Sequence, residues 1–121
     1  MDGISDRLIE EFKNPKNVGI VRGANAIGRS VDEERSDMLR IYLKIEKNKI
    51  VEAKFKAFGS SSLIAVGSVA TTILKGKNAE VLDSFDTSLV EKELGVLAPH
   101  SKYCLNMLKD ALTNARDNFH K

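Results

Sequence analysis

Several residue types are scarce in this chain of 121 residues, and each scarcity excludes a class of structure or chemistry. Cys104 is the single cysteine, which rules out an intrachain disulfide and any metal site built from several cysteines of one chain. The two histidines, His100 and His120, leave a serine nucleophile few bases to pair with. The longest apolar-leaning run, residues 63–74, is too short and too polar to span a bilayer.

Net charge is also low. The 19 basic and 17 acidic residues leave a net charge of +2, which gives no electrostatic case for binding nucleic acid or a membrane. Hydrophobic residues make up 42% and charged residues 30%, as in a folded globular protein, and the length suits one domain over residues 1–121. The N-terminus, MDGISDRLIEEF, is acidic and lacks the apolar region of a signal peptide, so we expect a cytoplasmic protein.

Two segments alternate apolar and polar residues as paired strands do. Residues 38–46 and 50–58 show this period of two, with one polar face, which predicts antiparallel strands packed on one side. The apolar positions are Leu39, Ile41, Leu43, Ile45, Val51, Ala53, Phe55 and Ala57. Residues 47–49 are short enough to form the turn of a hairpin, and residues 26–31 predict a further short strand.

The N-terminal segment predicts a short amphipathic helix. Ser5 or Asp6 can cap it, because the side chain of either accepts a hydrogen bond from a free backbone N–H. Pro15 ends it, since the residue before a proline is disfavoured in the helical conformation. Its expected apolar face comprises Leu8, Ile9 and Phe12.

Helices are also expected in the second half of the chain. Residues 61–74 are small or apolar and predict a buried helix, with Gly76 just beyond its end. Residues 80–85 and 88–94 predict two short helices, and a last helix should begin near Pro99. The apolar stripe of that last helix comprises Cys104, Met107, Leu108, Ala111, Leu112, Ala115 and Phe119. Strands first and helices after them predict an α+β fold, a small antiparallel three-stranded sheet packed on one face by helices.

Three serines follow Gly59 where the predicted buried helix begins. Ser60, Ser61 and Ser62 can cap that helix and satisfy its free N–H groups. The same N–H groups can bind an anion, but the sequence has no phosphate-binding lysine pattern beside them. We therefore interpret these serines as capping residues.

Cys104 and its neighbours form a second candidate site. A lone cysteine on an apolar stripe is most often a core residue, whereas a cysteine near a helix start and beside Lys102 could be a reactive thiolate. His100 lies one helical turn before Cys104, and Asp37 precedes a strand. If the fold brings Asp37, His100 and Cys104 together, they could bind one metal ion.

Several short motifs occur in a characteristic order. Residues 14–19 read NPKNVG, residues 55–62 read FKAFGSSS, and residues 74–77 read LKGK. They resemble the segments NPRNVG, FKTFGCGSA and VKGK of the iron–sulfur cluster assembly scaffold family, the IscU and NifU N-terminal proteins. The resemblance covers about residues 4–119 and implies the same α+β fold.

The resemblance also implies where a site would lie. In that family three cysteines, with Asp or His near them, bind a [2Fe–2S] cluster, or zinc in its place. The cysteine positions match Arg35, Ser60 and Cys104, the histidine position matches Tyr103, and Asp37 is retained. Two of the three thiols are therefore replaced, and hydroxyl and guanidinium groups do not substitute well for thiolates.

Partners follow from the same resemblance. The last cysteine of the family accepts sulfur from a cysteine desulfurase, and here that position is Cys104, whose pKa Arg35 or Lys102 could lower. Residues 97–102 match the family's LPPVK chaperone-recognition segment only loosely, with one of its two prolines missing. The resemblance thus favours a desulfurase as partner and gives little support to chaperone docking.

Three functions remain open at this point. The first is a non-enzymatic scaffold-like protein with a degenerate cluster site, which accepts sulfur through Cys104 or acts as a partner-binding regulator. The second is a protein that binds one Zn or Fe ion through Asp37, Cys104 and His100, completed by Ser60 or by a second copy of the chain in a homo-oligomer. The third is an interaction domain in which an Arg35–Asp37 contact and the packing of Tyr103 replace the ligands.

Overall fold

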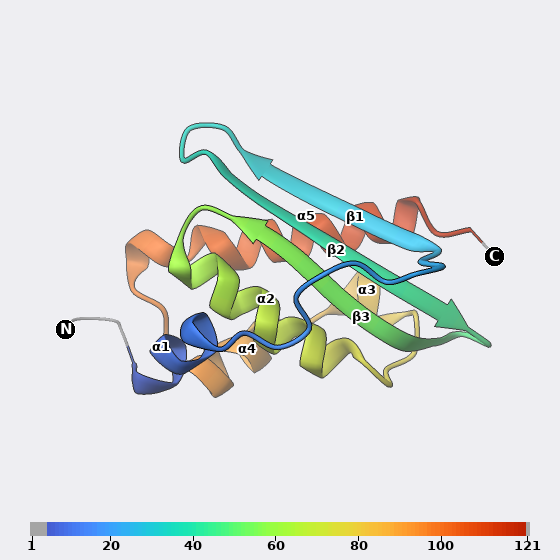
Figure 1. The fold of residues 1–121 in the computed structure, drawn as a ribbon, viewed down its shortest axis with the longest axis horizontal. Helices are drawn as coiled ribbons and strands as arrows, with labels where there is room; N and C mark the ends of the chain where they lie inside the picture. The colour runs from blue at the N-terminus through green and yellow to red at the C-terminus, as the bar shows by residue number, and fades with distance from the viewer. Residues whose placement is uncertain (1–4, 121) are drawn as a thin grey trace.

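A three-stranded antiparallel sheet carries the main helices on one face in the computed structural model, which describes residues 5–120 (Figure 1). The strands β1 (Ala26–Asp32), β2 (Asp37–Glu46) and β3 (Lys49–Phe58) lie in the order β1-β2-β3. This arrangement confirms the predicted α+β fold. Residues 1–4 and 121 of the predicted single domain lie outside the described residues.

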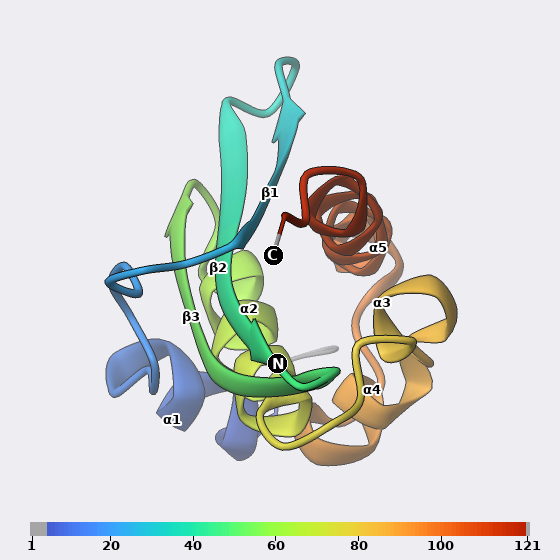
Figure 2. The same cartoon turned by 90° about the vertical axis from the view of Figure 1, so that its right-hand side faces the viewer.

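Two long helices cover the inner face of the sheet. Figure 2 shows α2 and α5 on the same side of the strands, with α2 packed against β3 and α5 against β1 and β2. The helices are α1 (Asp6–Lys13), α2 (Ser61–Leu74), α3 (Val81–Ser84), α4 (Ser88–Leu94) and α5 (Tyr103–Asp117), with a 3₁₀ turn at Pro99–Ser101. Within residues 5–120, no helix is both long and apolar enough to cross a membrane.

The hairpin between β2 and β3 departs from the predicted pattern at its turn. Lys47 and Asn48 both have positive φ, 51° and 65°, so two residues rather than three form the turn. A register shift follows, because Lys44 pairs with Glu52 while Ile45 pairs with Ile50. Val51 is the extra, bulged residue, so the prediction of Val51 as a core position is wrong and Ile50 is buried instead.

The first helix uses a different inner face from the predicted one. Ser5 caps it as expected, but of the predicted apolar face only Leu8 is buried, and 42% of the Phe12 side chain is exposed. Glu11 takes the inner position, with 1% exposure, because Ser68 on α2 donates a hydrogen bond to its carboxylate at 2.6 Å. Thus α1 is attached to α2 partly through a polar contact.

The Glu11 carboxylate is held in its charged form by its neighbours. Lys16 Nζ and Arg7 Nη2 lie 2.8 and 3.0 Å from Glu11 Oε2. Burial alone raises the pKa of Glu11, but the hydrogen bonds from Lys16 and Ser68 and the charges of Lys16 and Arg7 outweigh it and leave that pKa lowered. A buried charge is tolerated here because it is both paired and hydrogen-bonded.

The last helix begins later than predicted. Residues Pro99–Ser101 form a 3₁₀ turn, and α5 starts at Tyr103, which puts Cys104 in its first turn. The predicted apolar stripe is buried apart from Phe119, which follows the helix and is half-buried; Leu105 joins the buried set.

Gly28 allows α5 to lie unusually close to β1. A Cβ atom at this position would come 1.9 Å from the Ala111 carbonyl oxygen and 2.4 Å from the Ala115 nitrogen. Asn114 of α5 and Asn118, the residue just after it, then reach the strand edge, where Asn114 Oδ1 accepts from the Arg29 N–H at 2.9 Å and Asn118 Nδ2 donates to the Ile27 carbonyl. The closeness of helix and strand therefore depends on this glycine.

We expect Gly28→Ala to destabilise the protein by roughly 1–3 kcal/mol, because the new methyl group must displace the α5 backbone. Urea unfolding measures the change. Val31→Ala in the same strand is the control, since Val31 is exposed and its truncation should cost less. Equal stability of Gly28→Ala and the parent would contradict the close packing described here.

Candidate functional site

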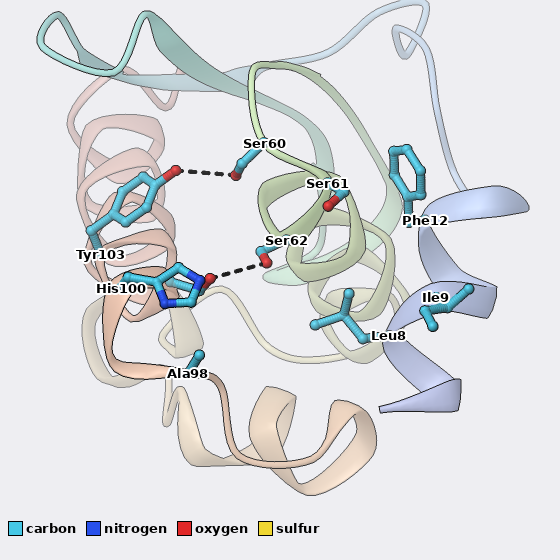
Figure 3. A pocket seen from close by; sticks show the side chains of 10 residues that line it. Leu8, Ile9, Phe12, Ser60, Ser61, Ser62, Ala98, His100 and Tyr103 are labelled. Carbon is cyan, nitrogen blue, oxygen red and sulfur yellow. Dashed lines mark hydrogen bonds between the residues drawn. The ribbon is translucent and has the colours of Figure 1, made fainter. Parts of the chain in front are cut away.

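The candidate site forms where three elements begin. Asp37 is the first residue of β2, Ser60 caps α2, and Tyr103 and Cys104 open α5. The Ser60 hydroxyl accepts a hydrogen bond from the Leu63 N–H at 3.2 Å, which confirms the predicted capping role. Figure 3 shows Tyr103 and Ser60 facing each other across the gap between α5 and α2.

A chain of hydrogen bonds connects these side chains. Tyr103 Oη donates to Asp37 Oδ2 at 2.5 Å and lies 3.1 Å from Ser60 Oγ. Ser60 Oγ in turn lies 3.7 Å from Cys104 Sγ. A phenol has one proton, and Tyr103 donates it to Asp37. The Ser60 hydroxyl must then donate to Tyr103 Oη, and the Cys104 thiol to Ser60 Oγ. We call these four residues the polar cluster.

The polar cluster is internally satisfied. Asp37 is buried, and Gly59, with φ +124°, leaves room for it, because a Cβ there would lie 1.9 Å from Asp37 Oδ1. Across the described residues, no buried side-chain nitrogen or oxygen lacks a hydrogen-bond partner. The cluster therefore presents no unpaired buried group that calls for a ligand.

Arg35 covers the cluster from outside. Its guanidinium carbon lies 4.0 Å from the centroid of the Tyr103 ring, a cation–π contact. Arg35 Nη1 also forms an ion pair with Asp32 Oδ2 at 2.7 Å. The predicted Arg35–Asp37 contact is replaced by this pair with Asp32, while Tyr103 binds Asp37. The only sequence signal for the pair is that Asp32 stands three residues before Arg35.

Cys104 is fully buried and its pKa is raised. Burial is the main cause, and the charge of Asp37 adds to it, while the neighbouring Ser60 and Tyr103 hydroxyls and the charge of Arg35 act against it. Lys102 lies elsewhere, 3.8 Å from Glu91. The charge of Arg35 lowers the pKa of this thiol as predicted, but burial outweighs it, and Lys102 is not among its causes, so Cys104 stays a protonated thiol at neutral pH.

The structure does not assemble the three predicted metal ligands. Asp37 and Cys104 both belong to the polar cluster, whereas His100 is exposed on the Pro99–Ser101 turn. Within the part of the chain that the structure describes, no three His, Cys, Asp or Glu side chains are grouped so that they could hold a metal ion. The single-metal hypothesis thus gains no support from the geometry.

A shallow pocket of about 310 Å³ adjoins the polar cluster (Figure 3). His100 lines it, and it lies between α1, the start of α2 and the turn before α5. Its other walls include Leu8, Ile9, Phe12, Ser60, Ser61, Ser62, Ala98, Ser101 and Tyr103. Phe12, predicted to lie on the apolar face of the first helix, is exposed and forms part of this wall.

We expect Tyr103→Phe to lower the free energy of unfolding by roughly 1–3 kcal/mol, because the buried Asp37 carboxylate loses its hydrogen-bond donor. Tyr42→Phe is the matched control, since none of the hydrogen bonds found within residues 5–120 involves the Tyr42 side chain. Urea unfolding of both variants measures the difference. Equal losses in the two variants would argue against a structural role for the Tyr103 hydroxyl.

The same tyrosine predicts a loss of stability in alkali. Burial, and then the bond to Asp37, raise the pKa of Tyr103 from 10.0 to about 12. A group whose pKa is higher in the folded state keeps its full stabilising effect below its unfolded pKa. The contribution of Tyr103 to the free energy of unfolding should therefore be lost as pH rises from 10 to about 12. Tyr103→Phe should unfold with a smaller dependence on pH over this interval, and an unchanged dependence would contradict the assignment.

Comparison of the sequence with known proteins identifies relatives over nearly the whole chain. The family described as "NifU-like N terminal domain" matches residues 4–121. Iron-sulfur cluster assembly scaffold protein IscU 1 of Archaeoglobus fulgidus is 35% identical over 111 residues, which cover 92% of this chain and 72% of that protein. The scaffold protein IscU of Azotobacter vinelandii is 33% identical over 125 residues, which cover 97% of this chain and 94% of that protein.

Solved structures share the fold at lower sequence identity. FiSufU from the thermophilic Fervidobacterium islandicum AW-1 superposes with a TM-score of 0.72 at 20% identity, covering 92% of this chain and 94% of that one. The N-terminal part of a nitrogen-fixing NifU-like protein from Brucella abortus superposes with a TM-score of 0.69 at 13% identity, covering 93% of this chain and 94% of that one. The fold, the order of motifs and the sequence relatives agree, and this chain belongs to the NifU-like N-terminal domain family of iron–sulfur cluster assembly scaffold proteins.

Proposed function

We propose that this protein is a non-enzymatic, partner-binding member of the scaffold family that holds no iron–sulfur cluster of its own. The observation that carries the proposal is the closed polar cluster at the place where the family resemblance puts the cluster ligands. There Tyr103 is hydrogen-bonded to both Asp37 and Ser60, and Ser60 contacts the thiol of Cys104. The protein retains the family fold, and hydrogen-bonded side chains of its own occupy the positions of the cluster ligands.

The donor set of the site does not fit a [2Fe–2S] cluster, zinc or iron. Such clusters are held mainly by thiolates, and Cys104 is the only cysteine, buried and with a raised pKa. Arg35 cannot lose its proton and brings positive charge to the position of a ligand. The Ser60 hydroxyl is already committed to capping α2.

A cysteine desulfurase is the partner that the family resemblance favours. A chain with the scaffold fold and no available thiolate could dock on the desulfurase without accepting sulfur. It would then compete with scaffold proteins that carry all three thiols, and so act as a regulator. Cys104 is a poor sulfur acceptor for the same reason, since a buried, protonated thiol is a weak nucleophile.

Anaerobic purification tests the absence of a cluster. We expect iron, zinc and acid-labile sulfide well below one per chain and no visible absorption band. Reconstitution with iron and sulfide should restore colour only in a variant with Arg35→Cys and Ser60→Cys, which adds two thiols beside Cys104. Adding Tyr103→His to this variant should increase the amount of iron and sulfide bound per chain after reconstitution.

The matched control is Ser61→Cys with Ser62→Cys, which adds the same number of thiols one and two residues away. Stoichiometric iron and sulfide in the parent protein, lost in Cys104→Ser, would overturn the proposal. Colour in the control variant equal to that of the Arg35 and Ser60 variant would show that these positions are not the ligand positions.

A sulfur-transfer assay tests the role of Cys104. With a cysteine desulfurase and L-cysteine, we expect direct binding but no persulfide on Cys104, as read by alkylation and mass spectrometry. Sulfide release by the same desulfurase with dithiothreitol verifies that the enzyme is active. Cys104→Ala should bind the desulfurase as the parent does, because the thiol lies inside the domain. A persulfide in high yield, or lost binding in Cys104→Ala, would contradict the proposal.

A further inference from the structure

The face of the sheet opposite to α2 and α5, which we call the outer face, carries two ordered rows of side chains. Residues directly opposite each other in neighbouring strands point to the same side. Arg29 pairs with Arg40, and Arg40 pairs with Lys56, so three cations form one row across all three strands. The next row toward the polar cluster is Val31, Met38 and Phe58.

The cationic row is not neutralised within the described chain. None of the ion pairs found among residues 5–120 involves Arg29, Arg40 or Lys56. The outer face does carry Glu52, but it lies opposite Lys44, two rows farther along the strands. Neighbouring strands are about 4.8 Å apart, so the three like charges are close and disfavour the free sheet.

The apolar row beside it is open to solvent. Val31 is 47% exposed and Phe58 is 58% exposed, and Met38 between them is half-buried. Residues 17–19 pair with the edge of β3 at Phe55 and the segment crosses the outer side toward the start of β1 (Figure 1). In Figure 2, no helix formed by residues 5–120 covers the end of the outer face where β1 finishes.

We infer that this end of the outer face binds an acidic protein surface. Carboxylates of the partner would lie over Arg29, Arg40 and Lys56, and an apolar side chain of the partner would pack on the row of Val31, Met38 and Phe58. An apolar patch flanked by charges, with arginine in it, has the composition of protein interfaces. Opposite charges would relieve the repulsion that the free sheet carries, and they would set the partner's orientation.

A protein fits these observations better than nucleic acid or a lipid surface. The net charge of the chain is only +2, and the cationic residues form one narrow row beside apolar ones instead of a broad basic patch. This inference is independent of the desulfurase proposal, because it concerns the outer face and is tested with a different probe.

The probe is a synthetic helical peptide with Glu along one stripe and Leu along the adjoining stripe, and its control has Gln in place of Glu. Titration into ¹⁵N-labelled protein should shift the backbone amides of Arg29, Arg40, Lys56 and Phe58 and leave α5 unchanged. Binding should weaken as salt increases, and the Gln peptide should bind at least about tenfold more weakly.

Charge reversal at Arg40 separates binding from folding. Arg40→Glu puts an acid between Arg29 and Lys56, so we expect it to unfold at a higher temperature than the parent and yet to lose binding of the Glu peptide at least about tenfold. Lys109→Glu makes the same change in net charge on the exposed side of α5, and it should bind as the parent does.

Three outcomes would overturn the inference. The first is no saturable binding of the Glu peptide at low salt. The second is a control that behaves like the test: the Glu and Gln peptides bind equally well, or Arg40→Glu and Lys109→Glu lose binding of the Glu peptide equally. The third is tighter binding to vesicles of phosphatidylcholine and phosphatidylserine than to the peptide, abolished by Arg40→Glu, which would assign the outer face to anionic lipid instead.

Discussion

The polar cluster, where β2, α2 and α5 begin, depends on the hydrogen bond from Tyr103 to Asp37. This bond joins the first residue of β2 to the first residue of α5, and through Ser60 it reaches the cap of α2. A buried carboxylate without a donor is costly, so the tyrosine hydroxyl fixes the relative positions of these three elements. Arg35 then lies over the same ring in a cation–π contact.

This arrangement changes the chemistry that the fold can perform. Thiolates are soft anionic donors, whereas the groups here are two hydroxyls, one carboxylate, one guanidinium and one buried thiol. Each hydroxyl is hydrogen-bonded to a neighbour, so the cluster leaves no buried side-chain nitrogen or oxygen without a partner. Membership of a scaffold family therefore describes the fold and the ancestry of this chain, and the site residues decide what it can carry.

Much of the fold could be predicted from the sequence, because period-two and helical patterns report burial directly. The hairpin, α2 and its Ser60 cap, and the buried stripe of α5 follow from such patterns. The bulge at Val51 could not be predicted, since Ile50 and Val51 are both apolar and either could face the core. The burial of Glu11 depends on Ser68 and Lys16, and the cation–π contact of Arg35 depends on Tyr103; both arise only when distant segments meet. The positions of Asp37, Ser60 and Cys104 in one cluster followed from family resemblance, not from local pattern.

Both edges of the sheet are occupied, and this restricts how the chain can associate with other chains. On β1, Asn114 accepts from the N–H of Arg29 and Asn118 donates to the carbonyl of Ile27, while residues 17–19 pair with β3 at Phe55. Strand addition needs a free row of backbone donors and acceptors, and these contacts interrupt that row on each side. Copies of this chain are therefore hindered from extending one sheet into the next, and β-augmentation by a partner peptide would first have to displace α5 side chains or the segment beside β3.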